Sequence, residues 1–416
     1  MKRIGPLLGL TTAALFTGGL AIGTPIASAA PAADGTFSVT SVGTNNQITQ
    51  GPDNNMWVTL DDATKNVARI TPAGVVTEYD LPGIASPIGI TSAGGNLWVT
   101  LNGAVARFDP AAPENAGTTV TTPLADIADP RSITVGPDGN LWTASGDKVL
   151  KIPPAAPATA TTYAATGVMG ARAISRSGDF LWVADFGGAQ VVRVATDGTG
   201  TAFATGGGPQ GVAGGAGGQV AYANPGSNPH TIGLINPTPP TVTVPSPLAD
   251  PFGVTFANDQ AYWVAQFAAE NLARVTAAGA LTTPINFPAG SGPRQIATGP
   301  GDTVWVTLDT AEKVGRVSGV TPPKAPETTI TKAPKAKVTT KKSHKKLTYR
   351  FASSVKGSAY QCRLARKGKA RPTWRTCTTP KTYRAKPGRY VFWVRASANG
   401  LTDPSPAKRA VRIVRR

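Results

Sequence analysis

The sequence predicts an all-β protein, a seven-bladed β-propeller followed by a small C-terminal β-sandwich. Three observations predict this fold class. A motif recurs seven times at intervals near 40 residues, the composition changes sharply at about residue 320, and two cysteines lie close together beyond that point. A period near 40 residues is the length of a four-stranded propeller blade. We therefore expect the propeller to occupy residues 30–319 and the sandwich residues 347–416.

Each copy of the motif contains one large aromatic residue after a turn rich in Gly, Asn or Asp, as in GPDNNMWVTL at 51–60 and GPDGNLWTAS at 136–145. The spacings between these aromatic residues are 41, 44, 40, 40, 41 and 42 residues. Alternating apolar positions around them are typical of strands packed between neighbouring blades. The aromatic positions, one per expected blade, are Trp57, Trp98, Trp142, Trp182, Tyr222, Trp263 and Trp305.

The two ends of the repeat array predict how the ring closes. The seventh copy lacks an outer strand, because a Pro- and Lys-rich stretch follows its third strand. An unassigned strand-like segment, FSVTSVG at 37–43, precedes the first copy. We expect residues 37–43 to complete the last blade, since pairing the two ends hides edges that an open ring would expose.

A basic residue recurs in the third strand of six copies, with Leu234 as the exception. A residue type that repeats in this way usually serves packing between neighbouring repeats. Stacking on the blade tryptophan or pairing with a turn aspartate are the expected roles. The six positions are Arg69, Arg107, Lys151, Arg193, Arg274 and Arg316.

The N-terminus has the pattern of a secretory signal peptide over residues 1–29. Lys2 and Arg3 precede a mostly apolar stretch at 7–22, and Ala27-Ser28-Ala29 supplies a small-residue cleavage site. No later stretch approaches the roughly 20 apolar residues of a membrane helix. We expect a secreted protein, extracellular or associated with the cell wall. In an exported chain, Cys362 and Cys377 are expected to form a disulfide.

The formal net charge of +18 is divided unevenly along the chain. Residues 320–416 carry 26 Lys and Arg against two acids, whereas residues 30–319 carry 13 basic and 21 acidic residues. Residues 320–346 read as a Pro-, Lys- and Thr-rich linker that merges into a first edge strand. The basic module is expected to bind an anionic cell-wall polymer or another anionic envelope surface. Export argues against a specific nucleic-acid partner, and we expect a monomer.

Two stretches of the chain resemble known families. GPDGNLWT at 136–143 and NVARITPAGVVTEYDLP at 66–82 resemble the streptogramin lyase (virginiamycin B lyase) family over about residues 37–318. The resemblance implies a seven-bladed propeller. The run from YQCRL at 360–364 to the Pro- and Ser-containing segment before the last strand resembles the Ig-like or fibronectin type III-like modules of exported actinobacterial proteins.

The lyase family opens a cyclic depsipeptide by elimination, using histidine bases and a glutamate-bound magnesium ion, and these residues are not matched here. The family's inner-strand histidine positions correspond to Gln47, Ile88, Arg131, Arg172, Gln210, Phe252 and Arg294. The second-strand glutamate positions correspond to Leu60, Leu101, Ser145, Asp185, Asn224, Gln266 and Leu308. His230 matches neither set. Because elimination without a positioned base is slow, we assign no catalytic residue.

The same positions supply the candidate binding residues. Arg131, Arg172 and Arg294 occupy one repeated point facing a channel mouth, where they could hold an anion or pair with a nearby acid such as Asp129. Gln210 and Gln266 are further candidate ligand-binding residues. Asp185 and Asn224 could hold a divalent cation, Mg²⁺ or Ca²⁺, or could cap turns through backbone hydrogen bonds.

Two classes of function follow from this pattern. The favoured hypothesis is a secreted or cell-surface propeller that binds a small molecule, glycan or peptide at the channel mouth and is held at the envelope by the basic sandwich. The alternative is an enzyme, either a diverged streptogramin lyase-like C–O lyase or a metal-dependent lactonase-type hydrolase. A fold shared with enzymes does not decide between them.

Overall fold

The computed structural model describes residues 30–43, 45–115, 120–128, 130–164, 166–237, 240–398 and 400–416. The predicted signal peptide, residues 1–29, lies outside the described residues. The described chain is all-β, as predicted, with two short 3₁₀ helices, η1 (Pro157–Thr159) and η2 (Ala216–Gly218). Within this part of the chain, no helix is long and apolar enough to cross a membrane.

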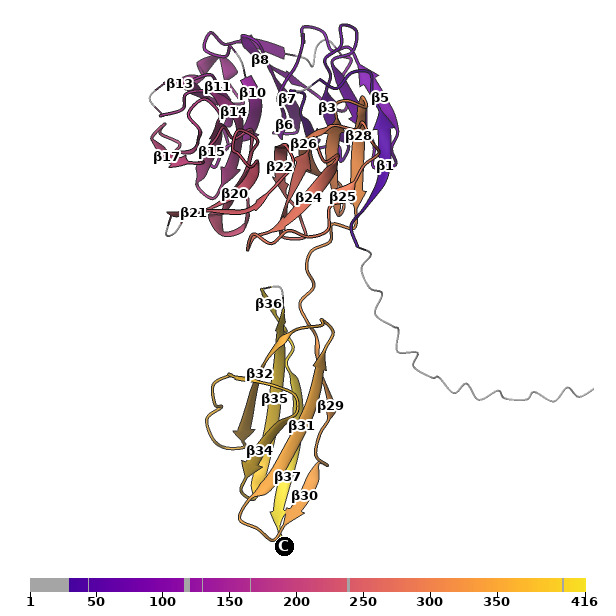
Figure 1. Cartoon of the computed structure of the whole chain (residues 1–416), viewed down its shortest axis with the longest axis vertical. Coiled ribbons are helices and arrows are strands. Elements are labelled where there is room, and N and C mark those ends of the chain that lie inside the picture. Colours follow the sequence, from indigo (N-terminus) through magenta and orange to yellow (C-terminus); the bar gives the residue numbers. More distant parts are fainter. Residues whose placement is uncertain are drawn as a thin grey trace, which may run out of the picture.

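Seven four-stranded antiparallel sheets follow the repeat and form the blades (Figure 1). The innermost strands contact one another in sequence order, and the last of them contacts the first, so the ring is closed. The innermost strands are β2 (Ile48–Gln50), β6 (Ile90–Ala93), β10 (Pro130–Val135), β14 (Ala171–Ser177), β18 (Gly211–Gly214), β22 (Pro251–Phe256) and β26 (Pro293–Gly299).

The remaining strands of each blade run outward from these. The second strands are β3 (Met56–Thr59), β7 (Asn96–Leu101), β11 (Leu141–Ser145), β15 (Phe180–Asp185), β19 (Val220–Asn224), β23 (Ala261–Gln266) and β27 (Thr303–Leu308). The third strands are β4 (Val67–Ile70), β8 (Ala104–Phe108), β12 (Lys148–Ile152), β16 (Gln190–Val194), β20 (Thr231–Pro237), β24 (Asn271–Thr276) and β28 (Lys313–Ser318). The outer strands are β5 (Val76–Tyr79), β9 (Val120–Pro123), β13 (Thr161–Tyr163), β17 (Gly200–Ala204), β21 (Pro240–Pro247) and β25 (Ile285–Asn286), with β1 in the last blade.

The repeated aromatic residues lie in the second strands, where they are buried between blades. All seven are at most 2% exposed. Trp57, for example, stacks on Tyr79 of its own blade and meets Phe108 of the next blade edge-on. Burying such a side chain contributes roughly 1.5–3 kcal/mol, so the period seen in the sequence is the period of the hydrophobic core.

The strand that closes the ring is β1, and it begins earlier than residues 37–43. β1 (Ala32–Ser38) pairs with β28, so the N-terminal end of the described chain completes the last blade. Phe37 stacks on Trp305, with 5.3 Å between the ring centroids, and Asp34 pairs with Arg316 at 2.8 Å. Residues 39–43 cross to the first blade with Val39 and Val42 buried, and their apolar pattern mimicked a strand.

The recurring basic residues of the third strands stabilise the blades, as predicted. The guanidinium of Arg316 lies 5.5 Å from the ring centroid of Trp305. The ammonium of Lys151 lies 5.7 Å from the ring of Trp142 and 2.8 Å from Asp138. Arg274 pairs with Asp259 at 2.6 Å. Asp138 and Asp259 are turn residues that also accept the indole N–H of their blade tryptophans, whereas Arg316 pairs with Asp34 of β1.

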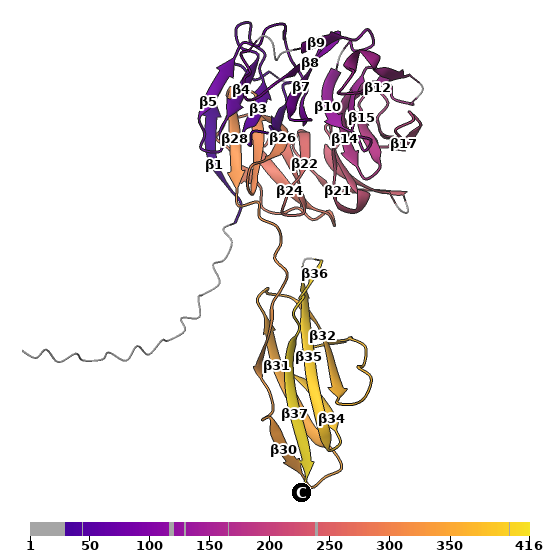
Figure 2. The ribbon, with the colours of Figure 1, turned by 180° about the vertical axis from the view of Figure 1, so that it is seen from behind.

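The C-terminal module is a two-sheet sandwich (Figure 2). One sheet contains β29 (Thr328–Lys332), β31 (Lys345–Ser353) and β34 (Lys381–Ala385). The other runs β30 (Lys337–Thr340), β37 (Ala407–Arg415), β35 (Gly388–Ala398), β32 (Ala359–Arg366) and β33 (Arg375–Cys377), with β36 (Leu401–Thr402) on β35. The predicted linker, residues 320–346, thus holds two paired strands, because their alternating Thr, Ile and Val residues pair with β31 and β37.

The core of the module lies between its sheets. Tyr349, Phe392 and Val394 are fully buried there. The disulfide between Cys362 and Cys377, predicted from the sequence, is confirmed and lies in the same core. Within the strand GRYVFWVRASA, alternation buries Phe392 and Val394 but leaves Trp393 partly exposed on the opposite face. The likeness of this module to Ig-like or fibronectin type III-like domains stays a prediction.

Candidate functional site

One mouth of the propeller channel holds a pocket of about 250 Å³. Four of the five predicted ligand-binding residues meet there, and Gln266 does not. Three of the lining side chains are cationic, and the described lining includes no acid. The lining residues are Asn45, Arg131, Arg172, Gln210, Phe252, Arg294 and Gln295.

The convergence of these residues has a local cause. Four inner strands change register near their first residues, between Pro130 and Ser132, Ala171 and Ala173, Pro251 and Val254, and Pro293 and Ile296. Such bulges bend a strand and re-aim the side chains beside them. The repeated position after the first residue of the strand therefore faces the mouth in each of these blades.

Arg294 is held firmly from two directions. Its Nε donates a hydrogen bond to the carboxylate of Asp309, which follows the second strand of the same blade. Its guanidinium carbon lies 4.4 Å from the ring centroid of Phe252 and 4.2 Å from that of Phe267. Of the two roles expected for these arginines, anion binding or pairing with a nearby acid, Arg294 shows the second. Stacking and the ion pair restrict this side chain before any ligand arrives.

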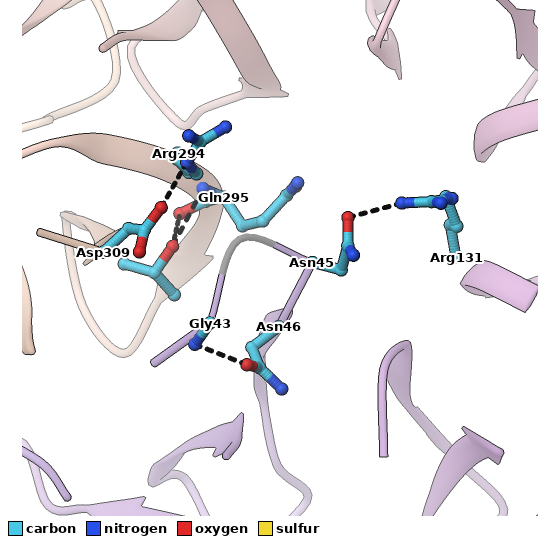
Figure 3. A network of polar contacts seen from close by, with 8 residues as sticks. Gly43, Asn45, Asn46, Arg131, Arg294, Gln295 and Asp309 are labelled. Atoms are coloured by element: carbon cyan, nitrogen blue, oxygen red, sulfur yellow. Dashed lines mark hydrogen bonds and ion pairs between the residues drawn. The ribbon is translucent and has the colours of Figure 1, made fainter. Parts of the chain in front are cut away.

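The other two arginines have different surroundings. Nη1 of Arg131 donates to Oδ1 of Asn45 at 2.6 Å, as Figure 3 shows. Asp129, the acid suggested as a partner for Arg131, lies outside the described residues. The guanidinium carbon of Arg172 lies 5.2 Å from the ring centroid of Phe186.

Asn45 belongs to the connection between the closing strand and the first blade, and the neighbouring Asn46 anchors this connection. Asn46 is buried, and its Nδ2 donates to Oγ1 of Thr59 and to the backbone oxygen of Pro87. Its Oδ1 accepts from the backbone N–H of Gly43 at 2.6 Å (Figure 3). The loop that reaches Arg131 is thereby fixed to the first two blades.

The electrostatics of the mouth favour an anion. Three arginines line one small pocket, and Asp309 neutralises Arg294 from outside the lining. Arginine N–H groups form short, charge-assisted bonds to carboxylate and phosphate oxygens. A second cavity of about 250 Å³ lies along the channel and is lined by the inner strands of all seven blades. The mouth therefore combines converging cations with room for a small group.

Asp185 and Asn224, the residues predicted to hold a divalent cation or to cap turns, end the second strands β15 and β19 of neighbouring blades. Asp185 is fully buried and accepts hydrogen bonds from the backbone N–H groups of Met169, Gly170 and Gly188 and from Nε2 of Gln190, at 2.7–3.2 Å. These four bonds engage both carboxylate oxygens, as the turn-capping alternative expects. Among the described residues, no group of three His, Cys, Asp or Glu is placed to hold a metal ion.

Asn224 and Gln266 also serve their own surroundings. Nδ2 of Asn224 donates to the backbone oxygen of Thr205 at 3.0 Å. Oε1 of Gln266 accepts from the N–H of Ala249 at 2.9 Å, and its Nε2 donates to Oδ1 of Asn271 at 2.6 Å. These bonds favour a structural role for Gln266. Oδ1 of Asn224 is buried and has no hydrogen-bond partner among the described residues.

Sequence reasoning missed Asn45 and Gln295 as lining residues, and it noted Phe252 without choosing it. Asn45 lies outside the repeat, so the repeat period gives no signal for it. Gln295 directly follows Arg294, and strict strand alternation would point it to the opposite face. The register change between Pro293 and Ile296 brings both residues to the pocket. His230 lies 3.9 Å from Asp250 and is not part of this lining.

Comparison with known proteins identifies the fold. No protein-family model and no curated protein matches the chain. The structure is similar to a solved streptogramin B lyase (20% identity over 68% of this chain and 96% of that chain, TM-score 0.59) and to virginiamycin B lyase from Staphylococcus aureus (23%, 68%, 98%, TM-score 0.58). It is also similar to the extracellular domain of a one-component system from B. thetaiotaomicron (13%, 90%, 58%, TM-score 0.51). At these identities, the likeness shows a β-propeller fold.

Proposed function

We propose that this is an exported binding protein whose propeller holds an anionic group of a small molecule, glycan or peptide at the channel mouth. The main support for this proposal is that Arg131, Arg172 and Arg294 line one pocket of about 250 Å³. Gln210, Gln295 and Asn45 add neutral hydrogen-bonding groups around the cations. A few converging polar groups in a concave site are the usual form of a small-ligand pocket.

Binding is favoured over catalysis by the chemistry of the lining side chains. Arginine stays protonated at neutral pH and does not accept protons as a general base. Among the described residues, the lining contains no carboxylate, histidine, cysteine or lysine side chain. Such a set can recognise and orient an anion, whereas the lyase and hydrolase alternatives each need a proton acceptor at the reacting group.

The basic sandwich is proposed to hold the chain at the cell envelope. Residues 320–416, the sandwich together with the segment before it, carry 26 Lys and Arg against two acids, a net charge far beyond the value of about 2–8 that keeps a small domain soluble. The predicted signal peptide and the disulfide both fit an oxidising compartment outside the cytoplasm. There the abundant partners for such charge are anionic envelope polymers.

The mouth is tested with the double variant Arg131→Gln/Arg172→Gln, which leaves the Arg294–Asp309 pair intact. Binding of citrate and of inorganic phosphate is measured by isothermal titration calorimetry. Each charge-assisted bond contributes about 1.5–3 kcal/mol, so we expect affinity to fall more than tenfold. The matched control is Lys65→Gln/Arg176→Gln, which removes the same charge from elsewhere on the propeller and should change affinity less than about threefold.

Three outcomes would contradict this function. Equal affinity in the wild type and the mouth variant would remove the arginines from the site. Failure of the wild-type protein to bind either anion would remove the anion site itself. Conversion of a bound ligand, detected by NMR of the same samples, would return the protein to the enzyme class.

A further inference from the structure

The outward face of the five-stranded sheet in the C-terminal module carries an unusual row of side chains. Alternation along β35 buries Phe392 and Val394 and turns Val391, Trp393 and Arg395 outward. Across the sheet, Trp393 is in register with Arg363 of β32 and Lys408 of β37. A partly exposed tryptophan therefore lies between two cations on a face that no other described strand covers.

A groove of about 420 Å³ lies beside this row. Its lining includes Ala365, Val391 and Ala410, which are in register on three adjacent strands, so the floor is smooth and apolar. Its described lining contains no acid. The cations around it are Arg366, Lys367, Lys369, Arg371, Arg389 and Arg412.

Two tryptophans hold the arginines of this face by stacking. Arg363 and Arg395 have their guanidinium carbons 4.3 and 4.4 Å from the ring centroid of Trp374. Arg371 and Lys408 lie 5.4 and 5.6 Å from the ring of Trp393. Stacking orients a guanidinium without using its in-plane N–H donors. Arg395 also donates through Nε and Nη2 to Oε1 of Gln361, at 2.9 and 2.7 Å. Nε of Arg363 is buried without a hydrogen-bond partner, and such groups usually require one.

The arrangement costs stability through repulsion between like charges. Arg389 and Arg412 are direct register partners on β35 and β37, a pairing that destabilises a sheet. Burial, together with the neighbouring charges of Arg371 and Arg395, lowers the pKa of the Arg363 guanidinium. Among residues 320–398 and 400–416, no ion pair offsets these charges. An anionic partner bound at this face would offset the repulsion between these cations.

The two acids of the module do not relieve this repulsion. Asp403 is buried and accepts hydrogen bonds from the N–H groups of Thr328 and Ser405, at 2.9 and 2.8 Å. Those bonds fix the start of β29 inside the fold. Glu327 precedes that strand, and neither acid lines the groove.

We propose that this face, made of Trp374, Trp393, Arg363, Arg371, Arg395, Lys408 and the adjacent groove, is the docking site for an acidic polysaccharide of the cell envelope. The cations fit the anionic groups repeated along such a chain, and the apolar floor fits the C–H faces of its sugar rings. The inference rests on the proposed envelope attachment and assigns it a surface and a ligand class.

A polysaccharide fits this face better than nucleic acid. Proteins that bind single strands without sequence preference offer aromatic ring faces on which bases stack. Here cations already lie over both tryptophan rings. The disulfide also indicates an oxidising compartment, where the envelope polymers are the abundant polyanions.

The test compares two triple variants of the chain 30–416. The face variant is Arg363→Gln/Arg371→Gln/Arg395→Gln. The matched control is Lys324→Gln/Lys332→Gln/Lys356→Gln, which removes three exposed charges outside this face and its groove. Binding of polygalacturonate at 0.1 M salt is measured by biolayer interferometry, with neutral dextran and an oligothymidylate as further probes.

We expect the face variant to bind polygalacturonate at least tenfold more weakly than the wild type, and the control less than threefold more weakly. The face variant should melt close to the wild type, because the repulsion that it removes offsets the lost stacking and the lost Arg395–Gln361 hydrogen bonds. That combination separates a binding face from a structural one. A second variant, Trp374→Ala, should weaken binding with all charges present, and Trp374→Phe should restore much of it.

Each contrary result has a distinct meaning. If the control weakens binding as much as the face variant, bulk charge binds the polymer and the assigned surface is wrong, while envelope attachment stands. Tighter binding of oligothymidylate than of polygalacturonate overturns the polysaccharide assignment. If the wild-type chain binds no anionic polymer at all, both this inference and the proposed attachment fail.

Discussion

The propeller and the C-terminal module both place cations on tryptophan rings, but they treat the charge in opposite ways. In the propeller, Lys151 lies over Trp142 and also contacts Asp138, whose carboxylate accepts the indole N–H at 3.0 Å. In the module, Arg363 lies over Trp374 and Trp393 beside other cations, with no carboxylate among its described neighbours.

The carboxylate is what separates a structural unit from a binding surface. With the aspartate present, cation, ring and acid satisfy one another, and little attraction remains for an outside anion. Without it, stacking still fixes the position of the guanidinium, and no acid offsets the charge that attracts an outside anion. The channel mouth lies between these cases, since Arg294 has an acidic partner and three arginines share one small pocket.

Removing the closing strand should have the largest effect, and it should destabilise the propeller without changing the module. Deleting residues 30–38 removes the ladder of β1 on β28, the Phe37–Trp305 stack and the Asp34–Arg316 pair. Losses in this range cost on the order of 3–5 kcal/mol, so the propeller should melt roughly 10 °C lower. Differential scanning calorimetry should show an unchanged module transition. A propeller transition that does not move would mean that β1 contributes nothing to closure.

A second test measures how much the disulfide stabilises the module, whose described residues form no ion pair. The Cys362→Ser/Cys377→Ser variant opens a bridge between residues 15 apart in sequence. A loop of this length corresponds to about 3 kcal/mol of stability, so we expect the module to unfold at clearly lower denaturant while the propeller is unaffected. Urea titration followed by tryptophan fluorescence measures both. Equal midpoints in oxidised wild type and variant would show that the core alone suffices.

The smallest change in stability is expected when the carboxylate of Asp138 is replaced by an amide. Burial opposes ionisation of Asp138, but hydrogen bonds from Lys151, Trp142 and Asn140 outweigh it and hold the pKa of this carboxyl well below its usual range. A depressed folded-state pKa stabilises the fold above the unfolded value of about 4, and this contribution is lost as pH falls toward the folded value. Asp138→Asn should therefore cost about 1–2 kcal/mol at pH 7 and progressively less below pH 4.

The control for this variant is Asp179→Asn, at an exposed turn, which should change stability by less than about 0.5 kcal/mol. Thermal melts from pH 7 to pH 3 give both differences. A destabilisation by Asp138→Asn that stays constant down to pH 3 would show that the ionised carboxylate is not what stabilises the unit.

The sequence by itself determined the features that depend on local period and covalent pairing. The spacing of Trp57 to Trp305 predicted seven blades, because each blade must bury one aromatic residue against the next. The single cysteine pair predicted the disulfide, and the residue counts placed the charge in the module. The repeated basic positions also predicted the stacked cations of Lys151 and Arg316, since a repeat places like residues in like surroundings.

The tertiary structure alone decided the features that depend on register between distant segments. The closing strand is Ala32–Ser38 because Phe37 finds Trp305, a contact that no local pattern contains. Gln295 reaches the mouth through a bulge, and Asn45 reaches it through a connection outside the repeat. Trp393 lies in the apolar run Val391–Val394, and pairing with β32 and β37 fixed which side of β35 faces inward. A side chain's neighbours across a sheet are set by long-range pairing, and that pairing placed the arginines around it.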